Sequence, residues 1–194
     1  MEIMILAILQ ARLSSTRLSE KVLKPILGKP MLLRQIERLQ HSEKIDKLVV
    51  ATSDNISDNL IEKVCLDNNI EVFRGDLNNV LDRFYNASLL YSPDYIVRLT
   101  SDCPLIDHEL IDEVIQNTVD GGFDYGSNTI KPSYPDGLDV EVFKFSALKI
   151  AWKKASLISE KEHVTPYIWK NSLHHGGNIF SSFDLYFGLD NLYS

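Results

Sequence analysis

Short apolar runs alternate with segments of helical period along the first two thirds of the chain. Residues 3–9 form a continuous apolar run, which is typical of a central parallel strand covered on both faces. Residues 47–52, 70–73 and 94–99 are further strand candidates. The helices expected between and after these strands lie at residues 57–68, 79–91 and 108–119 and directly after Pro30. This repeated order predicts an α/β fold, with a mostly parallel sheet between two layers of helices.

The last third of the chain has a looser pattern. Residues 123–142 hold four glycines and prolines that interrupt two strand candidates. Beyond them we expect helices at residues 146–155 and 159–169 and short strands at residues 178–180 and 185–189. No repeat, low-complexity tract or linker divides the sequence. We therefore expect residues 1–194 to form a single domain with a loop and strand excursion at about 123–142.

Composition is that of an ordinary globular protein, with 44% hydrophobic and 24% charged residues among 194. The formal net charge of −7 argues against a general nucleic-acid binder or a basic membrane-surface protein. The charge is unevenly distributed, however. Residues 1–34 contain six basic and two acidic residues, so they carry +4 while the rest of the chain carries −11. A local anion site therefore remains compatible with the composition.

The sequence also indicates where the protein acts. The apolar opening is short and lacks a basic leader, and no apolar run approaches the roughly 20 residues that span a bilayer. Cys65 and Cys103 are far apart and match no metal-binding spacing. We expect reduced thiols and a soluble, cytoplasmic protein without a membrane partner.

Two strand ends carry candidate chemistry, because ligands of open α/β sheets bind outside the carboxyl ends of the strands. The first is residues 10–21, QARLSSTRLSEK. Arginine, lysine and hydroxyl side chains at this density suit a polyphosphate, and a solvated basic loop is the equal alternative. The loop matches neither glycine-rich nucleotide motif, which excludes a P-loop ATPase and a dinucleotide dehydrogenase.

The second strand end is residues 98–105, RLTSDCPL. Asp102 follows an apolar strand and precedes Pro104. A lone carboxylate beside phosphates is a natural Mg²⁺ ligand, and the alternative is a carboxylate that caps a turn. Asp107 is better placed as a cap, because it directly precedes the helix expected at residue 108.

Several further motifs occur in a fixed order along the chain. They are ARLSSTRLSEK at 11–21, GKPM at 28–31, VVAT at 49–52, FRG at 73–75, VLDRFY at 80–85, RLTSDCPLID at 98–107, SNT at 127–129, YPDGLDVEVF at 134–143 and EKEHVTPYI at 160–168. Together they resemble the sugar-acid cytidylyltransferases, which include the 3-deoxy-manno-octulosonate and acylneuraminate enzymes. The chain is most similar to the spore-coat-polysaccharide type of that family, over essentially residues 3–190.

The resemblance implies a Rossmann-like nucleotide-diphospho-sugar transferase fold and a homodimer. It also implies transfer of CMP from CTP to a sugar acid, with Mg²⁺ and release of pyrophosphate, for surface polysaccharide synthesis. By resemblance, catalysis would depend on Arg12, Arg17, Lys21 and Asp102; nucleotide binding on Ala11, Arg12, Ser15, Arg17, Lys21, Arg74 and Arg83; substrate binding on Tyr134, Asp136, Asp139 and Glu141; and metal binding on Asp102 and Asp190.

The chain departs from the family pattern at two places. Residues 18–21 read LSEK where the family has Leu-Pro-Gly-Lys, so Glu20 brings a negative charge beside the expected phosphates. Only four residues follow Asp190, which is therefore either a second metal ligand on a short C-terminus or an accidental match. Two alternatives to a cytidylyltransferase stay open. One is a glycosyltransferase of the same fold that uses a sugar nucleotide, and the other is a catalytically silent nucleotide-binding or assembly subunit. His163 could contact substrate, but a single histidine on a helix is more often a structural hydrogen bonder, and this is the role we expect for it.

Overall fold

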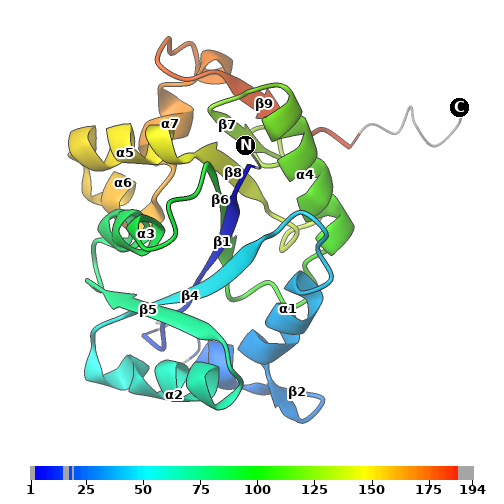
Figure 1. The fold of residues 1–194 in the computed structure, drawn as a ribbon, viewed down its shortest axis with the longest axis vertical. Helices are drawn as coiled ribbons and strands as arrows, with labels where there is room; N and C mark the ends of the chain where they lie inside the picture. Colours follow the sequence, from blue (N-terminus) through cyan, green and yellow to red (C-terminus); the bar gives the residue numbers. More distant parts are fainter. Residues whose placement is uncertain (1–2, 15–17, 19, 188–194) are drawn as a thin grey trace, which may run out of the picture.

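The structure, a computed structural model, describes residues 3–14, 18 and 20–187. In these residues a seven-stranded sheet has the order β5-β4-β1-β6-β8-β7-β9 (Figure 1). The strands are β1 (Ile5–Gln10), β4 (Lys47–Ser53), β5 (Glu71–Gly75), β6 (Tyr95–Thr100), β7 (Tyr125–Ser127), β8 (Glu141–Lys144) and β9 (Ser182–Asp184). All of them except β8 run in the same direction. The expected mostly parallel sheet is confirmed.

Helices cover both faces of the sheet, as Figure 1 shows. One face packs against α1 (Met31–Leu39), α2 (Asn59–Asp67) and α4 (His108–Asp120). The other packs against α3 (Val80–Leu89), α5 (Phe145–Lys154) and α7 (Pro166–Lys170), and α6 (Ile158–His163) lies against α3. Side chains of β1 alternate between the two faces, with Ala7 in one core and Leu6 and Ile8 in the other. This alternation along fully buried strands produces the three layers that the sequence predicts.

Local signals set several element boundaries. The Asp107 carboxylate accepts hydrogen bonds from the backbone N–H groups of Glu109 and Leu110, which confirms it as the cap of α4. A hairpin of β2 (Pro25–Ile26) and β3 (Lys29–Pro30) precedes α1. Its two turn residues, Leu27 and Gly28, both have positive φ, which matches the twist of paired strands. Three short 3-10 helices complete the described elements: η1 (Lys21–Leu23), η2 (Ile56–Asp58) and η3 (Leu173–His175).

The helix expected at residues 159–169 is wrong, because the structure has two helices there, α6 and α7. Between them Val164 adopts φ 70° and ψ −59°. The Thr165 backbone N–H donates to the His163 carbonyl at 2.8 Å, which closes a γ-turn around Val164. A γ-turn with positive φ is rare and strained, above all for a β-branched residue. Pro166 then begins α7, where its fixed φ suits the first turn.

The two strands expected near the C-terminus are also misplaced. The strand there is β9, which pairs parallel with β7, and residues 178–180 make only an isolated bridge between Phe180 and Ser172. The apolar residues at 186 and 187 suggested a strand, but both are about half exposed. Phe187 stacks edge-on against Tyr134 instead of pairing in the sheet.

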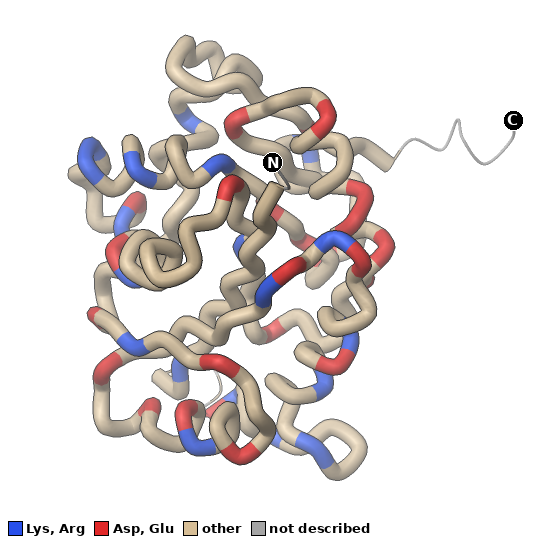
Figure 2. The backbone as a smooth tube through the Cα atoms, viewed as in Figure 1, with Lys and Arg blue, Asp and Glu red and all other residues tan. Residues whose placement is uncertain are grey.

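The strand order places a crevice outside the carboxyl ends of β1 and β6. The chain passes from β1 to β4 and β5 on one side and then crosses to β6 on the other. Gln10 and Thr100, the last residues of β1 and β6, are register partners. Such a reversal is where ligands of open sheets bind. Figure 2 shows that charge is also unevenly placed, with acidic positions along α4 and basic positions along α1 and the β2–β3 hairpin.

Candidate active site

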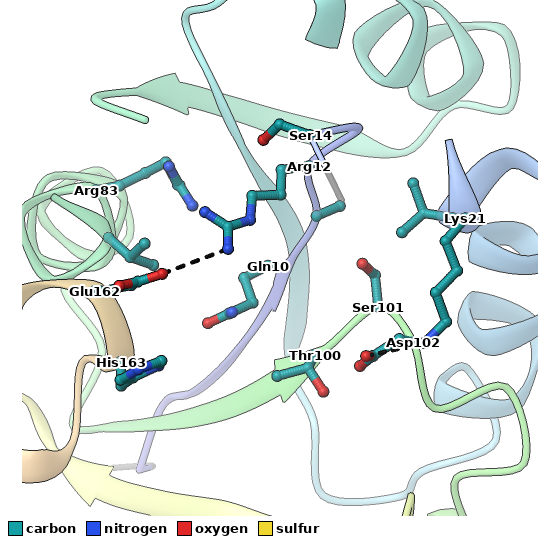
Figure 3. Close-up of a pocket in the computed structure, with 13 residues that line it drawn as sticks. Gln10, Arg12, Ser14, Lys21, Arg83, Thr100, Ser101, Asp102, Glu162 and His163 are labelled. Carbon is teal, nitrogen blue, oxygen red and sulfur yellow. Dashed lines mark hydrogen bonds and ion pairs between the residues drawn. The ribbon is translucent and has the colours of Figure 1, made fainter. Parts of the chain in front are cut away.

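A cavity of about 250 Å³ lies at the carboxyl ends of β1 and β6 (Figure 3). The loop after β1 supplies Arg12, η1 supplies Lys21, and the loop after β6 supplies Asp102. The complete lining is Gln10, Ala11, Arg12, Ser14, Lys21, Val22, Val80, Arg83, Thr100, Ser101, Asp102, Glu162 and His163. The two strand ends that the sequence singled out therefore meet in one cavity. We call it the first cavity.

Lys21 and Asp102 form an ion pair across the first cavity. The Lys21 Nζ lies 3.2 Å from the Asp102 Oδ2, and both side chains are more than a third exposed. Burial by itself would raise the pKa of Asp102, but hydrogen bonds from Thr100 and Lys21 outweigh it, so this pKa is lowered. The carboxylate is thus ionised and accessible from the cavity, as a cation ligand must be.

Two guanidinium groups face the other end of the first cavity. The Arg12 Nη2 lies 3.5 Å from the Glu162 Oε1 in a pair that is about 40% exposed. Arg83 is only 2% exposed; its Nη1 donates to the Asp76 carbonyl at 2.6 Å, while its Nε has no partner in the described structure. Burial lowers the pKa of Arg83 to about 10, against the opposing effect of Asp58. Arg83 therefore stays cationic at neutral pH, and both guanidinium groups can donate hydrogen bonds to phosphate oxygens.

A buried carboxylate fixes the start of the loop after β1. Asp58 is fully buried, and its Oδ1 accepts a hydrogen bond from the Leu13 backbone N–H at 2.9 Å. Its Oδ2 accepts from the hydroxyl and backbone N–H of Ser53 at the end of β4. Ala11 extends β1 by donating its N–H to the Ala51 carbonyl at 3.1 Å. These bonds hold the loop against the sheet as far as Leu13.

Sequence reasoning missed Asp58, and it included Gln10 and Glu162 only as members of longer motifs, without a role of their own. The Gln10 Oε1 is buried and has no hydrogen-bond partner in the described residues. Figure 3 shows the Gln10 amide pointing into the space between Arg12, Thr100 and His163. The available signal was position, because Gln10 ends a strand whose loop was already a candidate. Glu162 gave no comparable signal, since it is about 60 residues from the nearest strand end of the site.

A second cavity of about 380 Å³ adjoins the first. Its lining is Arg98, Thr100, Thr129, Asp139, Glu141, His163, Thr165, Pro166 and Trp169. Thr100 and His163 line both cavities. Asp139 and Glu141, two of the expected substrate residues, are therefore in a cavity next to the expected nucleotide site. Burial raises the pKa of Asp139, and repulsion from Asp136 and Glu141 raises it further.

Glu141 is part of a buried polar network in the wall of the second cavity. One of its oxygens pairs with Arg98 on the neighbouring strand, and the two side chains are only 10% and 15% exposed. The other accepts a hydrogen bond from the Tyr125 hydroxyl at 2.7 Å. Burial, with Glu141 nearby, raises the pKa of Tyr125 well above its ordinary value. Glu141 therefore joins β6, β7 and β8, and Asp139 is the more accessible carboxylate.

The structure does not bring every expected residue into these cavities. Arg74 lies outside both linings; its guanidinium donates to Asn59, Glu62 and the carbonyls of Ser53 and Asn55, which ties β5 to the end of β4 and to α2. Asp136 and Tyr134 also lie outside both linings. Burial and the charge of Glu113 on α4 raise the pKa of Tyr134, which places it near that helix. Ser15, Arg17 and Asp190 fall outside the described residues.

The described residues contain no group of three or more His, Cys, Asp or Glu side chains that could hold a metal ion by themselves. Asp102 nevertheless fits Mg²⁺, which takes one or two protein carboxylates and completes its coordination with phosphate oxygens and water. Cys65 and Cys103 are free thiols. In the part of the chain that the structure describes, no helix is long and apolar enough to cross a membrane.

A mostly parallel sheet with a cationic cavity at its topological switch point is the arrangement in which open α/β folds bind their ligands. The family described as "Cytidylyltransferase" matches residues 6–188, and the chain belongs to this family. An uncharacterized protein of Methanocaldococcus jannaschii is 45% identical over 93% of this chain and 71% of its own. The spore coat polysaccharide biosynthesis protein SpsF of Bacillus subtilis is 40% identical over 84% of this chain and 69% of its own.

Solved structures agree with the fold. A cytidylyltransferase from Leptospira borgpetersenii has a TM-score of 0.88 and 31% identity, covering 96% of this chain and 77% of that one. A CMP:2-keto-3-deoxy-manno-octonic acid synthetase, solved with CTP, has a TM-score of 0.69 at 16% identity, over 95% of this chain and 90% of that one. The second similarity confirms the expected nucleotide-diphospho-sugar transferase fold and nothing finer.

Proposed function

We propose that the chain transfers CMP from CTP to a hydroxyl of a sugar acid and releases pyrophosphate, as a step in surface polysaccharide synthesis. The observation that carries this proposal is the meeting of Arg12, Lys21 and Arg83 with Asp102 in the first cavity. Family membership supports the nucleotidyl transfer. The B. subtilis relative, named for spore coat polysaccharide biosynthesis, supports the pathway class. A maize 3-deoxy-manno-octulosonate cytidylyltransferase, 35% identical over 64% of this chain and 43% of its own, supports the sugar acid.

The cations of the first cavity would hold the triphosphate. Lys21 and Arg12 now pair with Asp102 and Glu162 in exposed contacts of 3.2 and 3.5 Å, and exposed pairs of this kind are worth at most about 1 kcal/mol. A triphosphate therefore displaces the carboxylates at little cost and takes over both cations. In the reaction the sugar hydroxyl oxygen bonds to the α-phosphorus and pyrophosphate leaves with the bonding electrons. Positioning and charge neutralisation suffice for such a step, without a covalent nucleophile.

Mg²⁺ would be held by Asp102 together with oxygens of the triphosphate, and by Asp190 if that residue reaches the cavity. When bound, the ion supplies neutralisation of phosphate charge. Releasing Asp102 from Lys21 for this purpose also frees the lysine for a phosphate oxygen. The sugar would occupy the second cavity, where Asp139 and Thr129 offer groups for its hydroxyls. The homodimer and the cytoplasmic location expected from the sequence stay predictions.

The test begins with binding. A panel of CTP, UTP, GTP and ATP with Mg²⁺ is compared by thermal shift, and a ligand at 100 times its Kd adds about 2.7 kcal/mol of stability. We expect CTP to give the largest shift. Equal shifts for all four nucleotides would contradict the assignment to CTP.

Turnover is then measured as pyrophosphate release from CTP with a panel of sugar acids. Release that requires both a sugar acid and Mg²⁺ is the expected result. Release of a nucleoside diphosphate from a sugar nucleotide would indicate the glycosyltransferase alternative. CTP binding without turnover on the whole panel would favour a silent binding subunit.

A further inference from the structure

His163 lies where the two cavities meet. It is the last residue of α6, and with Thr100 it lines both the first and the second cavity. Figure 3 shows its ring extending from α6 toward Gln10 and Thr100. If the triphosphate occupies the first cavity and the sugar the second, the attacking hydroxyl and the α-phosphate meet beside this ring. This argument rests on the proposed function.

The His163 ring is free of protein partners in the described structure, unlike the rings of the other four histidines. His174 shares a hydrogen bond with the Ser182 hydroxyl at 2.7 Å, and His175 packs against Trp169. The remaining two, His41 and His108, pack against each other. Outside α6, the hydrogen bonds of His163 in the described residues are those that its backbone carbonyl accepts from the N–H and hydroxyl of Thr165. The expectation of a structural hydrogen bonder is therefore wrong, because the imidazole has no structural bond to make.

The backbone after His163 is strained. Val164 forms the γ-turn with φ 70° and is fully buried against the core of the α3 face. An unfavourable backbone conformation of this kind persists only where the surrounding packing enforces it. Its effect here is to end α6 at His163, so the ring projects from a helix terminus into the junction. Strained residues of this kind cluster at functional sites, and this one adjoins an imidazole that forms no hydrogen bond with the described residues.

We propose that His163 accepts the proton of the attacking sugar hydroxyl. As the hydroxyl oxygen bonds to the α-phosphorus, its proton moves to an imidazole nitrogen, and the bond from phosphorus to the pyrophosphate oxygen breaks. The proton passes to solvent after the product leaves, since His163 is exposed. His163 lines two cavities that contain other charged groups. These are Arg12, Lys21, Arg83, Asp102 and Glu162 in the first cavity and Arg98, Asp139 and Glu141 in the second.

The test compares the chain with its His163→Gln and His163→Ala variants in pyrophosphate release from CTP. We expect kcat to fall about 10²–10⁴-fold, the usual contribution of a general base, while the thermal shift given by CTP stays the same. Wild-type kcat should fall with decreasing pH, because a protonated imidazole cannot accept the proton of the hydroxyl. The His163→Gln variant should lose this dependence, and added imidazole should restore part of the activity of His163→Ala.

His41→Gln is the matched control, because His41 lines neither cavity, and it should keep the wild-type kcat and pH profile. A His163→Gln variant with wild-type kcat and an unchanged pH profile would overturn the role of His163 alone. A wild-type chain that releases no pyrophosphate with any acceptor would overturn the proposed function, and this role with it.

Discussion

The two adjoining cavities differ in charge and in how their charges are held. The first has three cations and two carboxylates in its lining, whereas the second has one cation and two carboxylates. In the first, the ion pairs of Arg12 and Lys21 are between 36% and 44% exposed, so their partners can be exchanged. In the second, the pair of Arg98 with Glu141 is 15% and 10% exposed. The cations of the first cavity can therefore bind a ligand, whereas Arg98 in the second cavity is committed to Glu141 and stabilises the cavity wall.

This difference follows from the architecture. The first cavity is built by loops that leave parallel strands at the switch point of the sheet, where backbone and side chains are free to face a ligand. The second lies over the antiparallel part, where Arg98 of β6 and Glu141 of β8 are register partners on neighbouring strands. Cross-strand partners lie close enough to bind each other. The comparison therefore predicts that substitutions of the exposed ion pairs of the first cavity change activity, whereas substitutions of the buried Arg98–Glu141 pair change stability.

The largest effect is expected for Asp102→Asn. The amide lacks the negative charge that a hard cation requires, so pyrophosphate release should fall about 10³-fold, as for loss of a group that stabilises charge at the reacting centre. The unfolding free energy should change by less than about 1 kcal/mol, because the lost Lys21 pair is exposed. Steady-state rates and urea unfolding measure both. A variant with wild-type turnover at saturating Mg²⁺ would remove Asp102 from the site.

A matched pair of substitutions tests the comparison directly. Arg98→Met leaves Glu141 buried without its cation and should cost about 3–5 kcal/mol of unfolding free energy. Lys21→Met breaks a pair of the same charge type in the first cavity, should cost less than about 1 kcal/mol, and should weaken CTP binding instead.

Adding Glu141→Gln to Arg98→Met should recover part of the loss, because the orphaned charge is gone. Urea unfolding of the three variants is the measurement. Equal losses of stability for Arg98→Met and Lys21→Met would contradict the distinction between the cavities.

Asp58→Ala tests whether the first cavity depends on its buried support. The substitution leaves the backbone N–H groups of Leu13 and Ser53 without their carboxylate, and each buried unsatisfied group costs about 1–3 kcal/mol. We expect lower stability together with weaker CTP binding, since the loop that carries Arg12 loses its attachment. Calorimetric unfolding and nucleotide titration report the two effects. Normal CTP affinity in a destabilised variant would show that the loop needs no such support.

The smallest effect is expected for Glu162→Gln. The charge of Glu162 competes with phosphate for Arg12 through an exposed contact of 3.5 Å, so removing it should tighten CTP binding by no more than about fivefold. Stability should be unchanged within error. Titration of CTP at two salt concentrations measures the gain, which should shrink at higher salt. Weaker CTP binding would mean that Glu162 contacts the nucleotide instead of competing with it.

The parallel strands β1, β4, β5 and β6 and the helices between them could be predicted from the sequence, because buried strands and amphipathic helices leave strong periodic patterns. The two strand ends were readable for the same reason, and the structure brings Lys21 and Asp102 together as their positions imply. Arg74 shows the limit of this reasoning. An arginine at the end of a strand has the same pattern whether it meets a ligand or, as here, ties β5 to the end of β4 and to α2.

Local patterns did not place the α6 side of the site, although residues 160–168 form one of the motifs that resemble the family. Glu162 and His163 reach the cavity only because α6 packs on α3, a contact between segments that no local pattern joins. Pro166 is a signal for a helix break near this position, but the positive φ of Val164 has none, since valine is among the residues least expected there. The short strands β7 and β9, three residues each, are too brief for alternation to locate.

The order of the strands has a consequence for how the site is completed on the ribosome. Strands β1, β4, β5 and β6 and helices α1 to α3 lie within the first 100 residues, and a chain folds as its segments emerge. All three cations of the first cavity and Asp102 are therefore translated before α6, which brings Glu162 and His163. A nascent chain therefore contains the residues proposed to bind the nucleotide well before it contains His163, the residue we assign to proton removal. Translation thus adds the binding groups first and the reactive group last.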